Sequence, residues 1–176
     1  MAEKTLLAED PELFDACAGL VRRAAAARVT LGCAESCTGG LVAGCLTAVP
    51  GSSAVVRGGV VSYAIEVKRH LLGVCDEVLD APGVGAVSPE CAAQMAEGAR
   101  GALGCDVAVS ITGIAGPGGA EPGKPVGTVW MGLATPVGTR TFPHLFSGDR
   151  AEVRHAAVAR AVELLCGGVV EASRLG

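Results

Sequence analysis

The chain has 176 residues, of which 50% are apolar and only 3% aromatic, with 26 glycines and a formal net charge of −4. This length suits one well-buried domain better than two, so we expect residues 1–176 to form a single domain. The acidic charge balance excludes a broad cationic surface, and no general nucleic-acid binding is expected.

Composition and local start signals favour an α/β protein. A core of small aliphatic residues and glycine allows helices to pack closely on a sheet. Asp10-Pro11 and Ser88-Pro89 each combine a capping side chain with proline at the first helical position, and Asp149 with Glu152 resembles a capping box. The predicted elements, in chain order, are a helix over 10–27, a strand over 29–34, a helix from 41 to about 50, a strand over 55–63, a helix over 64–72, a helix over 88–102, a strand over 106–112, strands near 126–134 and 139–146, and a helix from 149 to about 172.

Strands and helices alternate early in this order, and Pro136-Val137-Gly138 joins the last two strands as an antiparallel hairpin. We therefore predict one three-layer α/β/α domain with a mixed, mostly parallel sheet of about five strands. The uncharged run from Cys37 to Val56 reaches membrane-spanning length. Because Pro50-Gly51 interrupts this run, it predicts a buried helix followed by a loop.

The turn Ala34-Glu35-Ser36-Cys37-Thr38-Gly39-Gly40 follows the first predicted strand and precedes a helix. Ligands of α/β proteins bind at such strand ends. The two glycines allow close backbone approach, and free N–H groups at the helix start can face a phosphate or an oxyanion. Ser36, Cys37 and Thr38 are three candidate nucleophiles or hydrogen-bond donors. An ordinary helix cap is the alternative interpretation of the same residues.

Two further turns with hydroxyl or glycine residues follow predicted strands, at 62–68 and 112–119. The carboxyl ends of parallel strands lie along one edge of a sheet. We therefore expect Ser36, Tyr63 and Thr112 to converge, although they are far apart in the sequence.

Charged residues near these turns extend the candidate site. Lys68 lies five residues after the tyrosine, and a partly desolvated amine there would lose proton affinity and could accept the Ser36 proton. The alternative for Lys68 is a solvated helix residue. Arg150 and Arg154, at the start of the last helix, could hold a phosphate, or could form surface ion pairs with neighbouring carboxylates.

The cysteines and histidines show no ligand spacing. The eight cysteines include no C-x-x-C pair and most lie in apolar runs, which predicts buried thiols in a reducing cytosol, with Cys37 as a reactive exception. His70, His144 and His155 are far apart, so no metal site is expected. The first ten residues, with Glu3-Lys4 among them, lack a signal-peptide pattern, and we expect a cytoplasmic protein.

Common catalytic fingerprints are absent: no P-loop, no dinucleotide-binding glycine motif after the first strand, no nucleophile elbow and no S-x-x-K. Seven other motifs occur in the order and spacing of one family. They are Ala34 to Gly40, Pro50-Gly51-Ser52-Ser53, Gly59-Val60-Val61-Ser62-Tyr63 with Glu66-Val67-Lys68, Gly85-Ala86-Val87-Ser88, Thr112 to Gly119, Lys124 to Val129, and Gly148-Asp149-Arg150. From about residue 12 to 170, the chain closely resembles the CinA C-terminal domain family.

This resemblance implies hydrolysis of the carboxamide of nicotinamide mononucleotide (NMN) to nicotinate mononucleotide and ammonia, a step of pyridine nucleotide salvage, because stand-alone members of the family are NMN deamidases. It also implies a three-layer α/β/α fold, no metal or organic cofactor, and a homodimer. The expected partner is this small substrate, with no nucleic acid and no membrane.

The resemblance gives the candidate residues roles. Ser36 would attack the amide carbon, Lys68 with Tyr63 would relay the proton, and backbone N–H groups around Thr38-Gly39-Gly40 would hold the oxyanion. The loop from Thr112 would line the nucleotide, and arginines or a lysine would face its phosphate. The expected substrate contacts are Glu35, Cys37, Thr38, Gly39, Gly40, Ser53, Thr112, Gly113, Gly116, Lys124, Arg150 and Arg154.

One departure from the family pattern follows Tyr63, where Ala64-Ile65 replace a polar pair that often contains asparagine. If that asparagine contacts substrate in relatives, substrate affinity or specificity differs here, but activity is expected to remain because Tyr63 and Lys68 are both present. Two alternatives to the deamidase remain open. One is a non-catalytic nucleotide-binding or regulatory module of the same type, and the other is an amidohydrolase that acts on another small amide.

Overall fold

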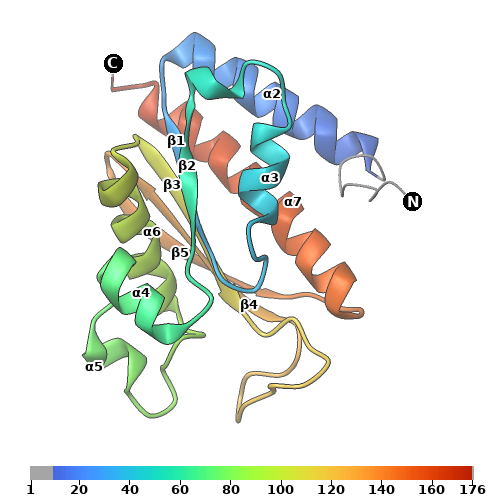
Figure 1. The fold of residues 1–176 in the computed structure, drawn as a ribbon, viewed down its shortest axis with the longest axis vertical. Helices are drawn as coiled ribbons and strands as arrows, with labels where there is room; N and C mark the ends of the chain where they lie inside the picture. The colour runs from blue at the N-terminus through green and yellow to red at the C-terminus, as the bar shows by residue number, and fades with distance from the viewer. Residues whose placement is uncertain (1–9, 176) are drawn as a thin grey trace.

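The computed structural model describes residues 10–175, so the polar segment 1–9, in which the sequence shows no signal pattern, lies outside the described residues. The elements form one five-stranded sheet of order β2-β1-β3-β4-β5 with helices on both faces (Figure 1). They are α2 (Pro11–Ala27), β1 (Leu31–Glu35), α3 (Leu41–Thr47), the 3₁₀ turn η1 (Ser52–Ala54), β2 (Val56–Val61), α4 (Ile65–Leu72), α5 (Asp76–Leu79), α6 (Pro89–Leu103), β3 (Val107–Gly113), β4 (Thr128–Thr135), β5 (Gly138–Leu145) and α7 (Arg150–Ala172).

The sheet is mixed, which confirms the predicted fold class. Strand β1 pairs in parallel with β2 and β3, whereas the β3–β4 and β4–β5 pairings are antiparallel. Four of the strands therefore run in one direction and β4 alone runs against them. As predicted, the carboxyl ends of β1, β2 and β3 lie at the same end of the sheet, the lower end in Figure 1.

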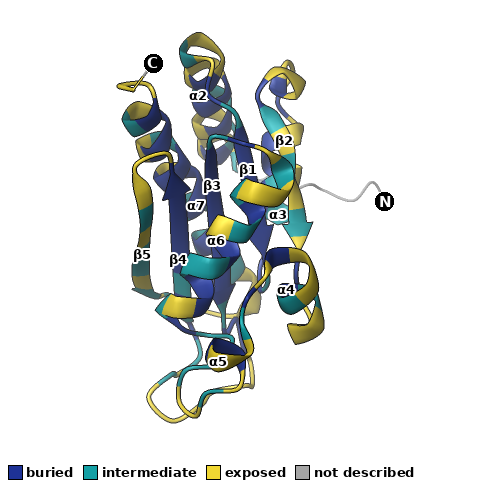
Figure 2. Ribbon diagram, turned by 90° about the vertical axis from the view of Figure 1, so that its left-hand side faces the viewer, coloured by how far each residue is buried: buried dark blue, intermediate teal, exposed yellow. Residues whose placement is uncertain are grey.

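Two apolar cores make the three layers. One core fills the space between the sheet and α2, α3 and α7, and the other lies between the sheet and α4, α5 and α6. The central strands β1 and β3 are buried on both faces, while β2 and β5 at the edges alternate between covered and open positions (Figure 2). The inner strands therefore read as apolar runs without alternation.

The helix starts follow the predicted caps. The Asp10 carboxylate accepts a hydrogen bond from the Leu13 N–H at 2.9 Å, and the Ser88 hydroxyl accepts one from the Cys91 N–H at 3.1 Å. Asp149 completes the expected capping box of α7. Each cap satisfies N–H groups that have no partner inside the helix, which fixes where the helix begins.

Two local predictions differ from the structure. Helix α3 ends at Thr47 rather than near Pro50, because the chain turns into η1 before β2. The short helix α5 was not predicted, because its four residues are too few to show a helical pattern of apolar residues. No helix within residues 10–175 is long and apolar enough to cross a bilayer. The uncharged run contains helix α3 and a loop, as predicted, but the helix is only partly buried, with Val42, Cys45 and Leu46 on its covered face.

Helices α4 and α6 pack in unusually close contact on their side of the sheet. A Cβ atom at Gly98 of α6 would lie 2.0 Å from the carbonyl oxygen of Leu72, the last residue of α4. Only a residue without a side chain fits there. This contact sets the distance of α4 from α6, and with it the position of the catalytic candidate that α4 carries.

Candidate active site

Ser36 and Lys68 meet at the carboxyl end of the sheet. Ser36 directly follows β1, and Lys68 is the fourth residue of α4. The Lys68 Nζ atom lies 2.9 Å from the Ser36 Oγ atom and also donates to the Ser62 carbonyl oxygen at 2.5 Å. The structure thus brings together the hydroxyl and the amine that the sequence proposed as nucleophile and proton acceptor.

The environment of Lys68 favours the neutral amine. Its side chain is only 1% exposed, and no carboxylate within residues 10–175 forms an ion pair with it. Burial lowers the pKa of Lys68 from its ordinary value of 10.5 because the protonated amine loses its hydration. A neutral lysine amine has a lone pair that can accept the hydroxyl proton, as in serine–lysine dyads.

The other two candidate nucleophiles of the turn are buried. Cys37 is 6% exposed, and burial raises the pKa of its thiol to about 11, so the expected reactive thiolate is absent at neutral pH. Thr38 is fully buried, and within the described chain its Oγ1 atom has no hydrogen-bond partner. Of the three, Ser36 is the one that is hydrogen bonded to Lys68 in the described chain.

Glu35 occupies a different place from the one expected of a substrate contact. Its side chain is fully buried and points to the start of α3. One carboxylate oxygen accepts from the N–H groups of Gly40 at 2.9 Å and Val42 at 3.1 Å, and the other accepts from the Ala43 N–H at 2.8 Å. Glu35 is therefore a cap of α3 within the fold, which corrects the sequence-based assignment.

Some backbone N–H groups of the turn have hydrogen-bond acceptors within the described chain, and others do not. The Gly39 N–H donates to the Ser36 carbonyl oxygen at 3.1 Å, and the Gly40 N–H is held by Glu35. These two cannot also hold an oxyanion, contrary to expectation. The N–H groups of Cys37 and Thr38 have no backbone or side-chain acceptor among the described residues. They are the remaining candidate oxyanion donors beside Ser36.

Arg154 connects α7 to the same turn. Its Nε atom donates to the Cys37 carbonyl oxygen at 3.1 Å, and its Nη2 atom donates to the Thr38 carbonyl oxygen at 2.9 Å. The guanidinium therefore holds the backbone of the turn rather than a surface carboxylate. The predicted alternative of an ion pair with a neighbouring acid is wrong for this arginine.

Arg150 bridges two other turns at the same end of the sheet. It donates to the Gly116 carbonyl oxygen at 2.8 Å and to the Tyr63 hydroxyl at 3.2 Å. An open cavity of about 430 Å³ lies beside Arg150, between Pro117 and the start of α7. The Asp149 carboxylate accepts from the N–H groups of Ala151 and Glu152 at the start of α7, so these N–H groups are not free to face the cavity, whereas the side chains of Arg150 and Arg154 line it.

Tyr63 does not take the position expected of a proton relay. It is 62% exposed, and within residues 10–175 its hydroxyl is hydrogen bonded to Arg150 and to neither Ser36 nor Lys68. The tyrosine thus lies at the rim of the site, next to the cavity.

Several expected contacts have other partners. The Thr112 hydroxyl donates to the Ala86 carbonyl oxygen at 2.6 Å, and Lys124 donates to the Val84 carbonyl oxygen at 2.6 Å. Both hold the loop before α6 and are not directed at Ser36. Gly113 closes β3 against β4, where a Cβ atom would lie 2.6 Å from the Thr128 carbonyl oxygen.

Ser53 is not brought to the site at all. It is exposed in η1, and η1 leads into the amino end of β2, at the opposite end of the sheet from Ser36. A proline-glycine-serine motif shows where a turn lies but does not show at which end of the sheet, so the sequence alone could not exclude this residue.

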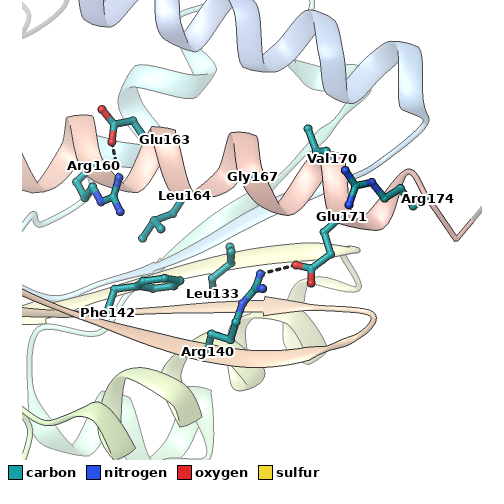
Figure 3. A pocket seen from close by; sticks show the side chains of 10 residues that line it. All are labelled: Leu133, Arg140, Phe142, Arg160, Glu163, Leu164, Gly167, Val170, Glu171 and Arg174. Atoms are coloured by element: carbon teal, nitrogen blue, oxygen red, sulfur yellow. Dashed lines mark hydrogen bonds and ion pairs between the residues drawn. The ribbon is translucent and has the colours of Figure 1, made fainter.

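A second cavity, of about 470 Å³, lies away from the site, between β5 and the C-terminal half of α7 (Figure 3). Its floor is apolar, with Leu133, Phe142 and Leu164. An ion pair of Arg140 with Glu171 joins β5 to α7 at one end, and the pair of Arg160 with Glu163 lies along α7 at the other. It holds no nucleophile. In the described part of the chain, no group of three or more His, Cys, Asp or Glu side chains is arranged to hold a metal ion.

Relatives of the chain are consistent with this architecture. The model of the CinA C-terminal domain matches residues 15–168. A CinA-like protein of Anaeromyxobacter dehalogenans is 54% identical over 138 residues, covering 78% of this chain and 33% of the relative. A CinA-like protein of Frankia casuarinae is 51% identical over 146 residues, covering 83% of this chain and 32% of the relative. The chain thus spans about a third of the length of the curated relatives it matches.

Solved structures show the same fold. A CinA superfamily protein from Klebsiella pneumoniae superimposes with a TM-score of 0.86 at 34% identity, covering 91% of this chain and 99% of that one. A competence/damage inducible protein from Agrobacterium tumefaciens gives a TM-score of 0.79 at 41% identity, covering 86% of this chain and 94% of that one. From the matched residues and these shared folds, the chain belongs to the CinA C-terminal domain family.

Proposed function

We propose that the chain is a serine–lysine amidohydrolase that converts NMN to nicotinate mononucleotide and ammonia. The observation that carries the proposal is the 2.9 Å contact between Lys68 Nζ and Ser36 Oγ, made by a lysine that is 1% exposed. A buried amine without a carboxylate partner is costly to keep charged, so its position beside a hydroxyl is best explained by proton transfer.

The first half of the reaction forms an acyl-enzyme. As Ser36 Oγ attacks the carboxamide carbon, Lys68 accepts the hydroxyl proton. The N–H groups of Cys37 and Thr38 are the candidates to stabilise the carbonyl oxygen as it becomes negative. Lys68 then donates its proton to the amide nitrogen, the C–N bond breaks, and ammonia leaves.

The second half releases the acid. A water molecule takes the place of ammonia, Lys68 accepts its proton, and the resulting hydroxide attacks the ester carbon. The proton returns to Ser36 Oγ as the ester bond breaks. One water is consumed for each ammonia released. The Ser62 carbonyl oxygen accepts from Lys68 throughout, which holds the amine in reach of both reacting groups.

The cavity beside Arg150 supports a phosphorylated substrate. Arg150 is exposed, and its guanidinium donates to a neutral carbonyl and a neutral hydroxyl, so its charge has no carboxylate partner in the described chain. A phosphate monoester would supply the opposite charge and two or more acceptor oxygens. Arg150 lies between this cavity and Tyr63, at the rim of the reaction site. The sugar of a mononucleotide would reach from a phosphate in the cavity to a carboxamide beside Ser36.

The test is ammonia release from NMN by the purified chain, beside Ser36→Ala and Lys68→Met. Folding of each variant is checked by circular dichroism and thermal melting. Release by the wild type and its loss in both variants supports the hydrolase. Nicotinamide riboside, which lacks the phosphate, is the matched substrate control.

Two results would overturn the proposal. Tight calorimetric binding of NMN without ammonia release would indicate a nucleotide-binding module. Equal turnover of NMN and the riboside would contradict phosphate recognition and would favour an amidohydrolase of broader substrate range.

A further inference from the structure

We propose that Glu35 is the positioning residue of the reaction site: its carboxylate fixes the start of α3 and thereby holds Ser36 in reach of Lys68. The inference rests on the proposed function only in taking Ser36 as the nucleophile. Glu35 is fully buried, and its two oxygens accept from three N–H donors at the start of α3, those of Gly40, Val42 and Ala43. It touches neither Ser36 Oγ nor Lys68 in the described structure.

The alternation of β1 places the two neighbouring side chains on opposite faces of the sheet. Leu31 and Cys33 belong to the core beneath α2, α3 and α7, whereas Ala34 belongs to the core beneath α4 and α6. Glu35 therefore points toward α3, and Ser36 points toward α4 and Lys68. One strand end thus supplies a cap on one face and a nucleophile on the other.

Helix α3 has no other cap at its start. Its N-cap is Gly40, with φ +101° and no side chain to accept a hydrogen bond. The Glu35 carboxylate, five residues earlier, takes the place of a capping serine or aspartate. It closes a loop that runs from Glu35 through Ser36 and back to Ala43.

Ser36 is held inside that loop from both sides. Its N–H donates to the Ile111 carbonyl oxygen at 2.9 Å, and its carbonyl oxygen accepts from the Gly39 N–H at 3.1 Å. The backbone on one side is anchored by β3, and on the other by Arg154 at the carbonyls of Cys37 and Thr38 and by the segment from Gly40 to Ala43 that Glu35 holds. If the carboxylate is lost, the second anchor loosens, and the hydroxyl is free to move from Lys68.

A buried neighbour supports the carboxylate. The Cys33 Sγ atom lies 3.5 Å from a Glu35 oxygen. Burial and the nearby Glu35 charge raise the pKa of Cys33 well above its ordinary value, so this thiol stays protonated and donates to the carboxylate. All the contacts of Glu35 therefore suit an acceptor of hydrogen bonds, and none suits a group that exchanges protons with substrate.

The experiment measures Ser36 reactivity without NMN. A fluorophosphonate probe, which labels activated serines, is followed by intact-protein mass spectrometry for wild type, Glu35→Gln and Glu35→Ala, well below the melting temperature of each. Glutamine keeps the size of the side chain but places an NH₂ group against backbone N–H donors. We expect labelling at Ser36 to slow about 10- to 100-fold in both variants, since small misplacements of a reacting atom have effects of this size.

Asp106→Asn is the matched control. The Asp106 carboxylate accepts from the Thr30 N–H and hydroxyl, each at 2.7 Å, at the opposite end of β1. This variant also loses a carboxylate that anchors backbone, but it lies away from Ser36, so its labelling rate should stay that of the wild type. Acetate, which matches the atoms removed in Glu35→Ala, should restore labelling in that variant, and acetamide should not.

Several outcomes would overturn the inference. One is labelling of Glu35→Gln within twofold of the wild-type rate. Another is acetate that raises the melting temperature of Glu35→Ala without raising its labelling rate, which would show a stabilising role alone. A wild type that is labelled at Ser36 but releases no ammonia from NMN would refute the proposed substrate and leave the role of Glu35 intact. In active enzyme, Glu35→Gln should lower kcat while KM changes little.

Discussion

The identity of the nucleophile leads to the sharpest prediction, because the two neighbouring candidates differ in ionisation. The thiol of Cys37 has a pKa of about 11, so at pH 8 only ~0.1% of it is thiolate. Ser36 instead contacts an amine that can take its proton. Replacing Ser36 by alanine should lower kcat by about 10⁴-fold or more, because only binding and oxyanion stabilisation would remain.

Cys37→Ala should lower kcat by less than about tenfold, since it removes a buried sulfur and leaves the backbone N–H in place. Ammonia release from NMN, measured at matched folded concentrations, compares the two variants. Iodoacetamide offers an independent check, because a thiol with a pKa of about 11 is alkylated slowly and activity should survive treatment. Inactivation by iodoacetamide at Cys37, together with an active Ser36→Ala variant, would refute the assignment.

Three further predictions concern the base, the phosphate site and the packing of α4. Because burial lowers the pKa of Lys68, kcat/KM should rise with pH and level off below 10.5. For the same reason, the free energy of unfolding of the wild type should increase relative to that of Lys68→Met as the pH rises toward 10.5, since the unfolded chain binds more protons than the folded one. Urea titrations at several pH values test the second part, and a difference that shrinks with pH would contradict it. Arg150→Ala should raise KM for NMN about tenfold or more, by loss of a charge-assisted contact, while leaving turnover of the riboside unchanged. Gly98→Ala should destabilise the fold by about 1–3 kcal/mol and lower kcat, because the new methyl displaces Leu72 and the helix that carries Lys68. Gly101→Ala, on the same helix but with open space at its Cβ, is the control and should be neutral or stabilising in thermal melts.

Much of the fold could be predicted because its element ends are set by local chemistry. The caps at Asp10, Ser88 and Asp149 each satisfy nearby N–H groups, so residues within three positions determine where the helix begins. The strand predicted over 106–112 is β3 (Val107–Gly113), because its mostly apolar residues form a run of strand length. Helix α5 could not be predicted, because four residues are too few to show a helical period.

The site was predictable only in part, because side-chain direction depends on tertiary packing. The carboxyl ends of parallel strands lie along one edge of a sheet, and from this rule the sequence predicts that Ser36 and Lys68 lie at the same end. It placed Glu35 with the substrate contacts, although strict alternation along β1 already puts it on the opposite face from Ser36. The partners of Arg150 and Arg154 lie on turns more than thirty residues away, and no local pattern predicts such contacts.

Helix α4 also has a consequence for how the protein opens. Only Lys68 and Leu72 are buried among its eight residues, so few apolar contacts hold it and its local unfolding should require less free energy than opening of β3. Each opening exposes the lysine to water, where its proton affinity is higher than in the closed helix, so protonation favours the open form. Amide hydrogen exchange in α4 should therefore accelerate, relative to the intrinsic chemical rate, as the solution is made more acidic. At acidic pH, local unfolding of α4 would then move Lys68 away from Ser36 while the sheet stays folded.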